Sequence, residues 1–246
     1  MVVRRQERHM LLTPAEKFIQ SAESELNPQQ FEAVKAKAGP LLILAGAGSG
    51  KTRALTYRMA YLVATGQARP NEILAVTFTN KAAREMHERT QKLLNRVGVS
   101  INARDLWIST FHSSCARILR THGSLLGYNP GFVIYDDSDQ LSVIKKICDK
   151  LNINDKIHPA KTFQYSINEA KNKYIGADEF KSKKGHFLDE KTALVYEAYE
   201  EEMHRSNAMD FGDLIVKTVK LFETSPETLD FYQERFKHIL IDEYAW

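Results

Sequence analysis

Glycines and a Lys-Thr pair lie close together in the octapeptide AGAGSGKT, residues 45–52, which follows the apolar run PLLIL. Phosphate-binding loops have the pattern G-x-x-x-x-G-K-S/T, in which backbone N–H groups surround the phosphates, the lysine reaches the outer phosphates and the hydroxyl ligates Mg²⁺. Gly50, Lys51 and Thr52 fit this pattern, whereas Ala45 stands where the pattern has its first glycine. The alternative is an ordinary strand–turn–helix junction. The apolar run before the loop and the helical pattern after it favour a phosphate loop.

Two adjacent acids, Asp242 and Glu243, follow the apolar run ILI near the end of the sequence. In nucleotide hydrolases with a phosphate loop, one carboxylate holds Mg²⁺ and another orients and deprotonates the attacking water. Taken alone, an Asp-Glu pair at a strand end is more often an ordinary pair of solvated acids. With the upstream loop, we expect Asp242 and Thr52 to share the metal, and Lys51, Asp242 and Glu243 to act in catalysis.

Two further stretches join an expected strand to an expected helix. TFTNKAAREM, residues 77–86, contains Phe78 between two threonines, and STFHSSC, residues 109–115, contains Phe111 and His112. In a parallel sheet both lie at carboxyl ends of strands, where ligands bind. Hydroxyl, amide and aromatic groups there suit single-stranded nucleic acid, with phosphates held and bases stacked. Each stretch alone could instead be a capped helix start with a core phenylalanine.

The elements that must position these residues alternate between strands and helices. Apolar runs predict strands at residues 41–45, 72–79, 105–113 and 238–244, and helical patterns occupy 13–24, 26–36, 51–66 and 80–98. The helix at 26–36 is expected to begin with Asn27 as its cap and Pro28 at its first position. Alternation of this kind predicts an α/β fold with a buried parallel sheet.

The middle of the sequence has a different pattern. From residue 114 to 205 apolar residues recur at helical spacing, as in DQLSVIKKICDKL and in the helix expected at 190–205. Residues 172–185 are polar and lysine-rich, which predicts a connection. A helix at 209–222 is expected to return to the first domain. The predicted organisation is therefore an extension at 1–24, an α/β domain at 25–113 and 206–246, and an all-helical insertion at 114–205.

Composition limits the class of protein. The 246 residues are 43% hydrophobic and 26% charged, as in a globular protein, and no apolar run reaches membrane-spanning length. The two cysteines lack metal or redox spacing, so we expect free thiols in the cytoplasm. Residues 1–113 hold 16 basic and 9 acidic residues, a net charge of +7. That excess suits a polyanion partner, although charge alone is better explained by a solvated mixed surface.

Together these stretches resemble the UvrD/Rep/PcrA group of superfamily 1 DNA helicases. The resemblance covers about residues 26–244 and rests on LNPQQFEAV, AGAGSGKTRALTYRMAYL, TFTNKAAREM, TFHSSCARILR, MDFGDLI and ILIDEY, in that order. It implies a RecA-like domain with a helical accessory insertion, and Ala45 is usual in that group's loop. It also implies an ATP site that includes Gln30, Gly46, Ala47, Gly48, Ser49, Gly50, Lys51, Thr52 and Arg53. The implied single-strand track contains Thr77, Phe78, Thr79, Asn80, Thr110 and His112.

The resemblance implies the N-terminal, ATP- and Mg²⁺-binding part of a monomeric ATP-dependent helicase that acts on single-stranded and junction DNA. After DEY the group continues Gln-Asp-Thr-Asn, whereas this sequence reads Ala245 and Trp246. We therefore expect it to lack the second RecA-like domain and its arginine finger, which contributes about 10³–10⁵ in rate. Little hydrolysis and no unwinding are expected of the sequence alone. The alternative is a non-catalytic DNA-binding or regulatory module, and a kinase is disfavoured because no phosphate-acceptor site is recognisable.

Overall fold

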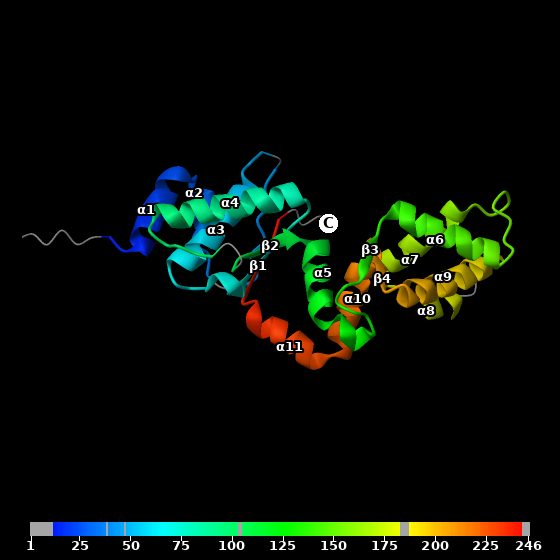
Figure 1. The fold of residues 1–246 in the computed structure, drawn as a ribbon. Helices are drawn as coiled ribbons and strands as arrows, with labels where there is room; N and C mark the ends of the chain where they lie inside the picture. Colours follow the sequence, from blue (N-terminus) through cyan, green and yellow to red (C-terminus); the bar gives the residue numbers. More distant parts are fainter. Residues whose placement is uncertain (1–11, 38, 47, 103–104, 183–186, 243–246) are drawn as a thin grey trace, which may run out of the picture. The chain divides into compact units, whose positions relative to one another are not determined.

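The computed structural model describes residues 12–242 except 38, 47, 103–104 and 183–186, and the side chains of 187–189 are also outside the description (Figure 1). The chain forms two compact units. The first comprises the residues up to Thr110 and those from Tyr232 onward, and the second comprises Phe111–Phe231. The second unit is therefore larger than the insertion expected at 114–205.

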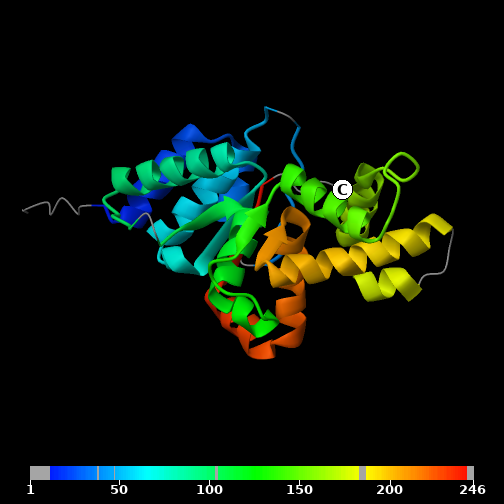
Figure 2. The same ribbon diagram turned by 45° about the vertical axis from the view of Figure 1, so that its right-hand side comes forward.

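A three-stranded parallel sheet forms the centre of the first unit (Figure 2). Its strands are β1 (Ile73–Thr77), β2 (Trp107–Thr110) and β5 (His238–Ile241), in the order β2-β1-β5. Thr77 pairs with Thr110, and Val76 pairs with Ile241, so the carboxyl ends of all three strands lie at one edge. The prediction of an α/β fold with a parallel sheet is confirmed.

Helices α1 (Pro14–Glu25), α2 (Pro28–Lys35), α3 (Lys51–Ala64) and α4 (Asn80–Arg96) belong to the same unit. The expected caps are present, since the Asn27 side chain accepts a hydrogen bond from the Gln30 backbone N–H at 2.8 Å. Met59 of α3 and Met86 of α4 are fully buried and belong to one apolar cluster with strand residues Ile73 and Ala75. This cluster fixes α3, which carries the Lys-Thr pair, against the sheet.

The strand expected at 41–45 is not present. Residues 41–46 have no regular secondary structure, and Leu42 and Leu44 are 56% and 80% exposed. A strand needs hydrogen-bonding partners along its length, and β1 already pairs with β2 on one side and β5 on the other. The run at 238–244 does contain a strand, but it is not buried as expected, because Ile239 of β5 is 62% exposed. Both corrections concern the side of the sheet on which β5 lies, opposite β2.

The end of α1 is held by an ion pair that makes its stability sensitive to acid. Hydrogen bonds from Arg96, Tyr57 and Ser21 lower the pKa of Glu25 to about 2, with Arg96 having the largest effect. Because the folded pKa lies below the ordinary value of 4.5, Glu25 stabilises the fold above pH 4.5 and loses this contribution as pH falls toward 2. The free energy of unfolding of the first unit should therefore decrease as the pH falls from 4.5 toward 2.

We expect Glu25→Gln to lower the free energy of α1 docking at pH 7 by about 1–2 kcal/mol, since hydrogen bonds to a charged group are lost. Hydrogen exchange of α1 amides at pH 7 measures this as faster exchange. The control is Glu23→Gln, an exposed residue of the same helix, which should leave exchange unchanged. Equal exchange in the two variants would contradict the assigned role of Glu25.

The second unit is mainly helical. It contains α5 (Phe111–His122), η2 (Gly123–Leu126), β3 (Val133–Tyr135), α6 (Asp137–Lys150), α7 (Ala160–Asn172), α8 (Ala177–Ser182), α9 (Phe187–Arg205), β4 (Ala208–Asp210) and α10 (Phe211–Thr224). Strands β3 and β4 form a parallel pair that sequence patterns did not predict. The connection expected at 172–185 contains α8. A further unpredicted helix, α11 (Pro226–Arg235), ends just before β5, and short η1 (Pro70–Glu72) precedes β1.

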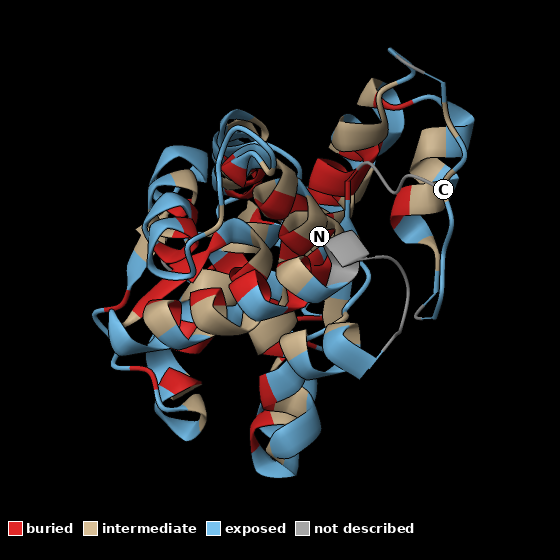
Figure 3. Cartoon of the chain, turned by 90° about the vertical axis from the view of Figure 1, so that its right-hand side faces the viewer, coloured by how far each residue is buried: buried red, intermediate tan, exposed pale blue. Residues whose placement is uncertain are grey.

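Helix α10 was expected to return to the α/β domain, but it belongs to the second unit because it packs against α5 and α7. Leu214 and Leu221 of α10 are buried within that helical layer. Buried residues, red in Figure 3, concentrate on the helix faces that pack together. The core between α6, α7 and α9 includes Phe163, Ile167 and Tyr199, all fully buried.

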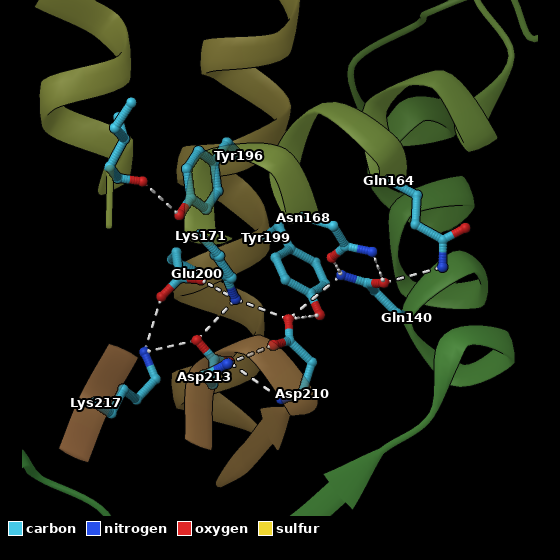
Figure 4. Close-up of polar contacts among 11 residues, drawn as sticks. Gln140, Gln164, Asn168, Lys171, Tyr196, Tyr199, Glu200, Asp210, Asp213 and Lys217 are labelled. Carbon is cyan, nitrogen blue, oxygen red and sulfur yellow. Dashed lines mark hydrogen bonds and ion pairs between the residues drawn. The ribbon is translucent and has the colours of Figure 1, made fainter. Parts of the chain in front are cut away.

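A network of charged side chains lies inside the second unit (Figure 4). The Lys171 ammonium of α7 lies 2.7 Å from carboxylate oxygens of Asp210 and Asp213 and 2.8 Å from Glu200 of α9. Burial alone would lower the pKa of Lys171, but the three carboxylates outweigh burial and hold that pKa well above its usual value. Lys217 lies 2.9 Å from Glu200 and completes the network. The network connects α7, α9, β4 and α10.

Candidate functional site

The loop between residue 45 and α3 has the backbone geometry of an anion-binding turn. Gly48 and Gly50 have φ values of 77° and 89°, in the left-handed region that glycine adopts readily. Gly50 is the N-cap of α3, and a Cβ atom placed there would lie 2.7 Å from the Gln30 side-chain nitrogen. Both restrictions explain a glycine at position 50. The N–H groups and dipole at the start of this 14-residue helix favour a negatively charged ligand.

The Lys51 ammonium folds back over this loop. It donates hydrogen bonds to the backbone carbonyls of Ala45 at 2.9 Å and Gly46 at 3.2 Å. The Ser49 hydroxyl also donates to the Gly46 carbonyl, at 2.7 Å. The loop thus holds one positive charge beside the N-terminus of α3. Ala47, which was assigned to the same cradle, lies outside the described residues.

Thr52 and Asp242 are 190 residues apart in sequence but in direct contact, because the Thr52 hydroxyl donates to Asp242 Oδ2 at 2.8 Å. The backbone N–H of Asp242 donates to the Val76 carbonyl at 2.9 Å, which fixes the acid at the end of β1. The predicted meeting of the loop with the acid after the last strand is therefore present. Glu243, the expected catalytic base, lies outside the described residues.

Asp242 has the properties of a metal-binding carboxylate. The residue is only 5% exposed, and its Oδ1 atom is buried without a hydrogen-bond partner in the part of the chain that the structure describes. A buried carboxylate oxygen without a partner is unfavourable, and a cation bound there would compensate it. Mg²⁺ prefers oxygen ligands and is commonly bound through one or two protein side chains plus phosphates and water. The Thr52 and Asp242 oxygens fit that requirement.

Gln30 and Arg53 lie beside the loop, each with a defined partner. The Gln30 side chain accepts a hydrogen bond from the Asn27 N–H and donates one to the Ser49 carbonyl at 2.9 Å, so it connects the start of α2 to the loop. Arg53 donates to the Glu25 carbonyl at 2.8 Å and so connects α3 to α1. Of these two candidate nucleotide contacts, Gln30 is the one hydrogen-bonded to the loop.

The candidate nucleic-acid residues after β1 differ in exposure. Phe78 is 76% exposed, and Asn80 is exposed at the start of α4. Thr79 caps α4 by accepting a hydrogen bond from the Ala82 N–H at 3.1 Å. Thr77 is buried, and its hydroxyl donates to the Thr79 carbonyl at 3.0 Å, which shapes the turn. The turn therefore presents one aromatic face and one amide to solvent.

The candidates after β2 fall into different units. Thr110 ends β2 in the first unit, beside Thr77 in the register, and is 8% exposed. His112 belongs to the second unit, where its ring meets Phe211 edge-on at a centroid distance of 5.7 Å. Sequence patterns placed Phe211 in a helix but did not indicate this contact. Its 49% exposure and its position inside the motif MDFGDLI are the signals that could have marked it.

None of the helices in the described parts of the chain has the length and apolar character needed to cross a membrane.

Comparison with known proteins gives one consistent result. Residues 26–245 match the profile of the family described as UvrD/REP helicase N-terminal domain. The chain is 48% identical over 221 residues to the ATP-dependent DNA helicase PcrA of Bacillus subtilis (strain 168), covering 90% of this chain and 29% of that protein. It is 45% identical over 221 residues to PcrA of Staphylococcus aureus (strain Mu50), covering 90% and 30%. The chain thus spans less than a third of the length of these relatives.

Proposed function

Because this chain belongs to the UvrD/REP helicase N-terminal domain family, we propose that it forms the ATP-binding part of an ATP-dependent DNA helicase. The observation that carries this proposal is the 2.8 Å contact between Thr52 and Asp242 beside a glycine loop at the start of α3. That contact brings a hydroxyl and a carboxylate together where a magnesium–triphosphate would bind.

The side chains around the loop have distinct roles in this proposal. The N–H groups at the start of α3 bind phosphate oxygens, and the Lys51 ammonium leaves the loop carbonyls to pair with the outer phosphates. Thr52 and Asp242 hold Mg²⁺, which when bound neutralises phosphate charge during hydrolysis. Gln30 contacts the adenine, and Glu243 orients and deprotonates the attacking water.

The edge of the sheet beside this site provides the proposed DNA contacts. Phe78 offers an exposed aromatic face on which a base can stack, and Thr79 and Asn80 offer polar groups to the strand. Thr110 extends the track, and the buried Thr77 shapes the turn that carries it. His112, which belongs to the second unit, is proposed as a separate DNA contact. The proposed substrates are single-stranded and junction DNA, bound by a cytoplasmic protein that acts as a monomer.

We expect Phe78→Ala to weaken binding of single-stranded DNA by about 1–3 kcal/mol, or about 5- to 150-fold, because one stacking face is removed. Fluorescence anisotropy with a labelled oligothymidine at fixed salt measures the change. Phe231→Ala is the matched control, since Phe231 is 50% exposed and belongs to the second unit. If single-stranded DNA binds elsewhere on the molecule, the Phe78→Ala variant will bind the oligothymidine as tightly as the control does.

For residues 26–245 alone we propose weak hydrolysis and no unwinding, since the matched segment is only 29% of the length of the Bacillus relative. Phosphate-release and strand-displacement assays test this, and ATP-driven unwinding by this chain would refute it. The alternative is a DNA-binding or regulatory module. DNA binding without any nucleotide binding that depends on Lys51 would support that alternative over an ATP site.

A further inference from the structure

Helix α10 begins with an aromatic residue that touches one of the proposed DNA contacts. Phe211 is the first residue of α10 and is 49% exposed, and its ring meets the His112 ring of α5 edge-on, with the centroids 5.7 Å apart. Aromatic rings favour this edge-on arrangement, so the Phe211 ring restricts the orientation of the His112 ring. Helix ends are the parts of helices that fray most readily. The orientation of His112 therefore depends on what holds the first turn of α10.

Asp210 holds this turn as the N-cap of α10. Its Oδ1 atom accepts a hydrogen bond from the Asp213 N–H at 2.7 Å, and its own N–H donates to Asp213 Oδ2 at 3.1 Å. This reciprocal pair is a capping box, and it uses one carboxylate oxygen of the capping residue. The cap thus leaves Asp210 Oδ2 available for partners outside α10.

Three buried side chains from three other helices donate to that second oxygen (Figure 4). Asp210 Oδ2 accepts hydrogen bonds from the Lys171 ammonium of α7 at 2.7 Å, the Tyr199 hydroxyl of α9 at 2.9 Å and the Gln140 amide of α6 at 3.3 Å. A helix cap requires none of these donors. Because they come from separate helices, they fix the Asp210 side chain relative to α6, α7 and α9.

Lys171 also packs directly on the first turn of α10. A Cβ atom placed at Gly212, the residue after Phe211, would lie 3.2 Å from Lys171 Cδ and 3.3 Å from Asp210 Oδ1, closer than an ordinary contact. Glycine at this position therefore lets the Lys171 side chain lie against the α10 backbone. Buried charges add little to stability, because apolar residues of similar volume often stabilise a fold equally well or better. The defined geometry that the network imposes on α10 explains it better than stability does.

We infer that Lys171, Tyr199 and Gln140 are positioning residues for DNA binding. Through Asp210 they hold the first turn of α10, and with it the aromatic ring that orients His112 toward single-stranded DNA. The contacts form one continuous path from the core of the helical unit to a partly exposed ring pair. This inference rests on the DNA contact proposed for His112.

Removing one hydroxyl tests this inference with little change in packing. Tyr199→Phe deletes a donor to Asp210 but keeps the buried ring. Tyr196→Phe is the matched control, because Tyr196 is buried on the same helix and its hydroxyl donates to the Ile175 carbonyl at 3.1 Å instead. In NMR spectra recorded without DNA, we expect the ring-current shift of the His112 imidazole protons to change in Tyr199→Phe and to stay unchanged in Tyr196→Phe.

Fluorescence anisotropy with a labelled oligothymidine measures the effect on binding. We expect Tyr199→Phe to weaken binding about 2- to 30-fold, the usual range for a residue that acts through a network, and Tyr196→Phe to bind as the unmodified chain does. In a His112→Ala background, Tyr199→Phe should have no further effect, because the ring that the network orients is absent. Hydrogen exchange of α9 amides shows whether both tyrosine variants keep the fold of the second unit.

An unchanged His112 shift in Tyr199→Phe would overturn the inference. An equal loss of DNA binding in the two tyrosine variants would overturn it too, because the hydroxyls would then act through stability alone. If His112→Ala binds DNA as tightly as the unmodified chain, the proposed DNA contact fails and the inference fails with it. If His112→Ala weakens binding whereas Tyr199→Phe does not, the inference alone fails.

Discussion

Replacing Lys171 by methionine lowers the free energy of unfolding of the second unit by about 3–5 kcal/mol, the usual cost of leaving buried charges without their partner. Lys171 is 4% exposed and lies within 2.8 Å of three carboxylates, from Asp210, Asp213 and Glu200. Methionine fills a similar volume but removes the one positive charge that, among the described residues, contacts all three carboxylates. Lys217, which remains, contacts Asp213 and Glu200 but is not paired with Asp210 in the described network.

The matched control is Lys173→Met. Lys173 closes the same helix, is 66% exposed, and lies 3.6 Å from Glu169, so its loss should change stability by less than about 1 kcal/mol. Hydrogen exchange of α7, α9 and α10 amides under native conditions measures the stability of the second unit separately from that of the first. If the Lys171 variant exchanged as slowly as the Lys173 variant, the three carboxylates would have to be satisfied without Lys171.

Replacing Lys51 by alanine should weaken binding of magnesium–ATP by about 1.5–3 kcal/mol, or about 10- to 150-fold, because a charge-assisted contact to phosphate is lost. The structure places the ammonium at the loop, where its hydrogen bonds to the Ala45 and Gly46 carbonyls can be exchanged for phosphate oxygens. Titration with a fluorescent ATP analogue measures the affinity. Single-stranded DNA binding by the same variant should be unchanged, since Lys51 is not in the proposed track.

Lys92→Ala is the control for that experiment. Lys92 is exposed on α4, and its replacement by alanine removes the same charge from the same unit. It should bind the analogue as the unmodified chain does. An equal loss in both variants would mean that net charge, rather than the Lys51 position, attracts the nucleotide.

The sequence predicts the loop well because its geometry is local. Glycine at positions 48 and 50 indicates left-handed backbone, and the structure has positive φ at both. The contact between Thr52 and Asp242 is not local, but it follows from the rule that carboxyl ends of parallel strands share one edge. Family membership is confirmed for residues 26–245, while the roles given to individual site residues stay predictions.

Other features depend on partners that no sequence pattern reveals. The apolar run at 41–45 predicts a buried strand, yet burial requires a neighbouring strand, which the described residues do not supply. Lys171 directly precedes the polar stretch at 172–185, and no sequence pattern indicated that it is buried among three carboxylates from distant positions. Strands β3 and β4 have three residues each, too few for an alternating pattern to be recognised.

The central claim is that Thr52 and Asp242 hold one Mg²⁺ against a bound triphosphate. Calorimetric titration with a non-hydrolysable ATP analogue, with and without Mg²⁺, on the unmodified chain and on Asp242→Asn tests it most directly. We predict that Mg²⁺ raises the affinity of the unmodified chain at least tenfold, whereas the Asp242→Asn variant binds equally with and without the cation. An Asp242→Asn variant that keeps the full Mg²⁺ effect would contradict the claim.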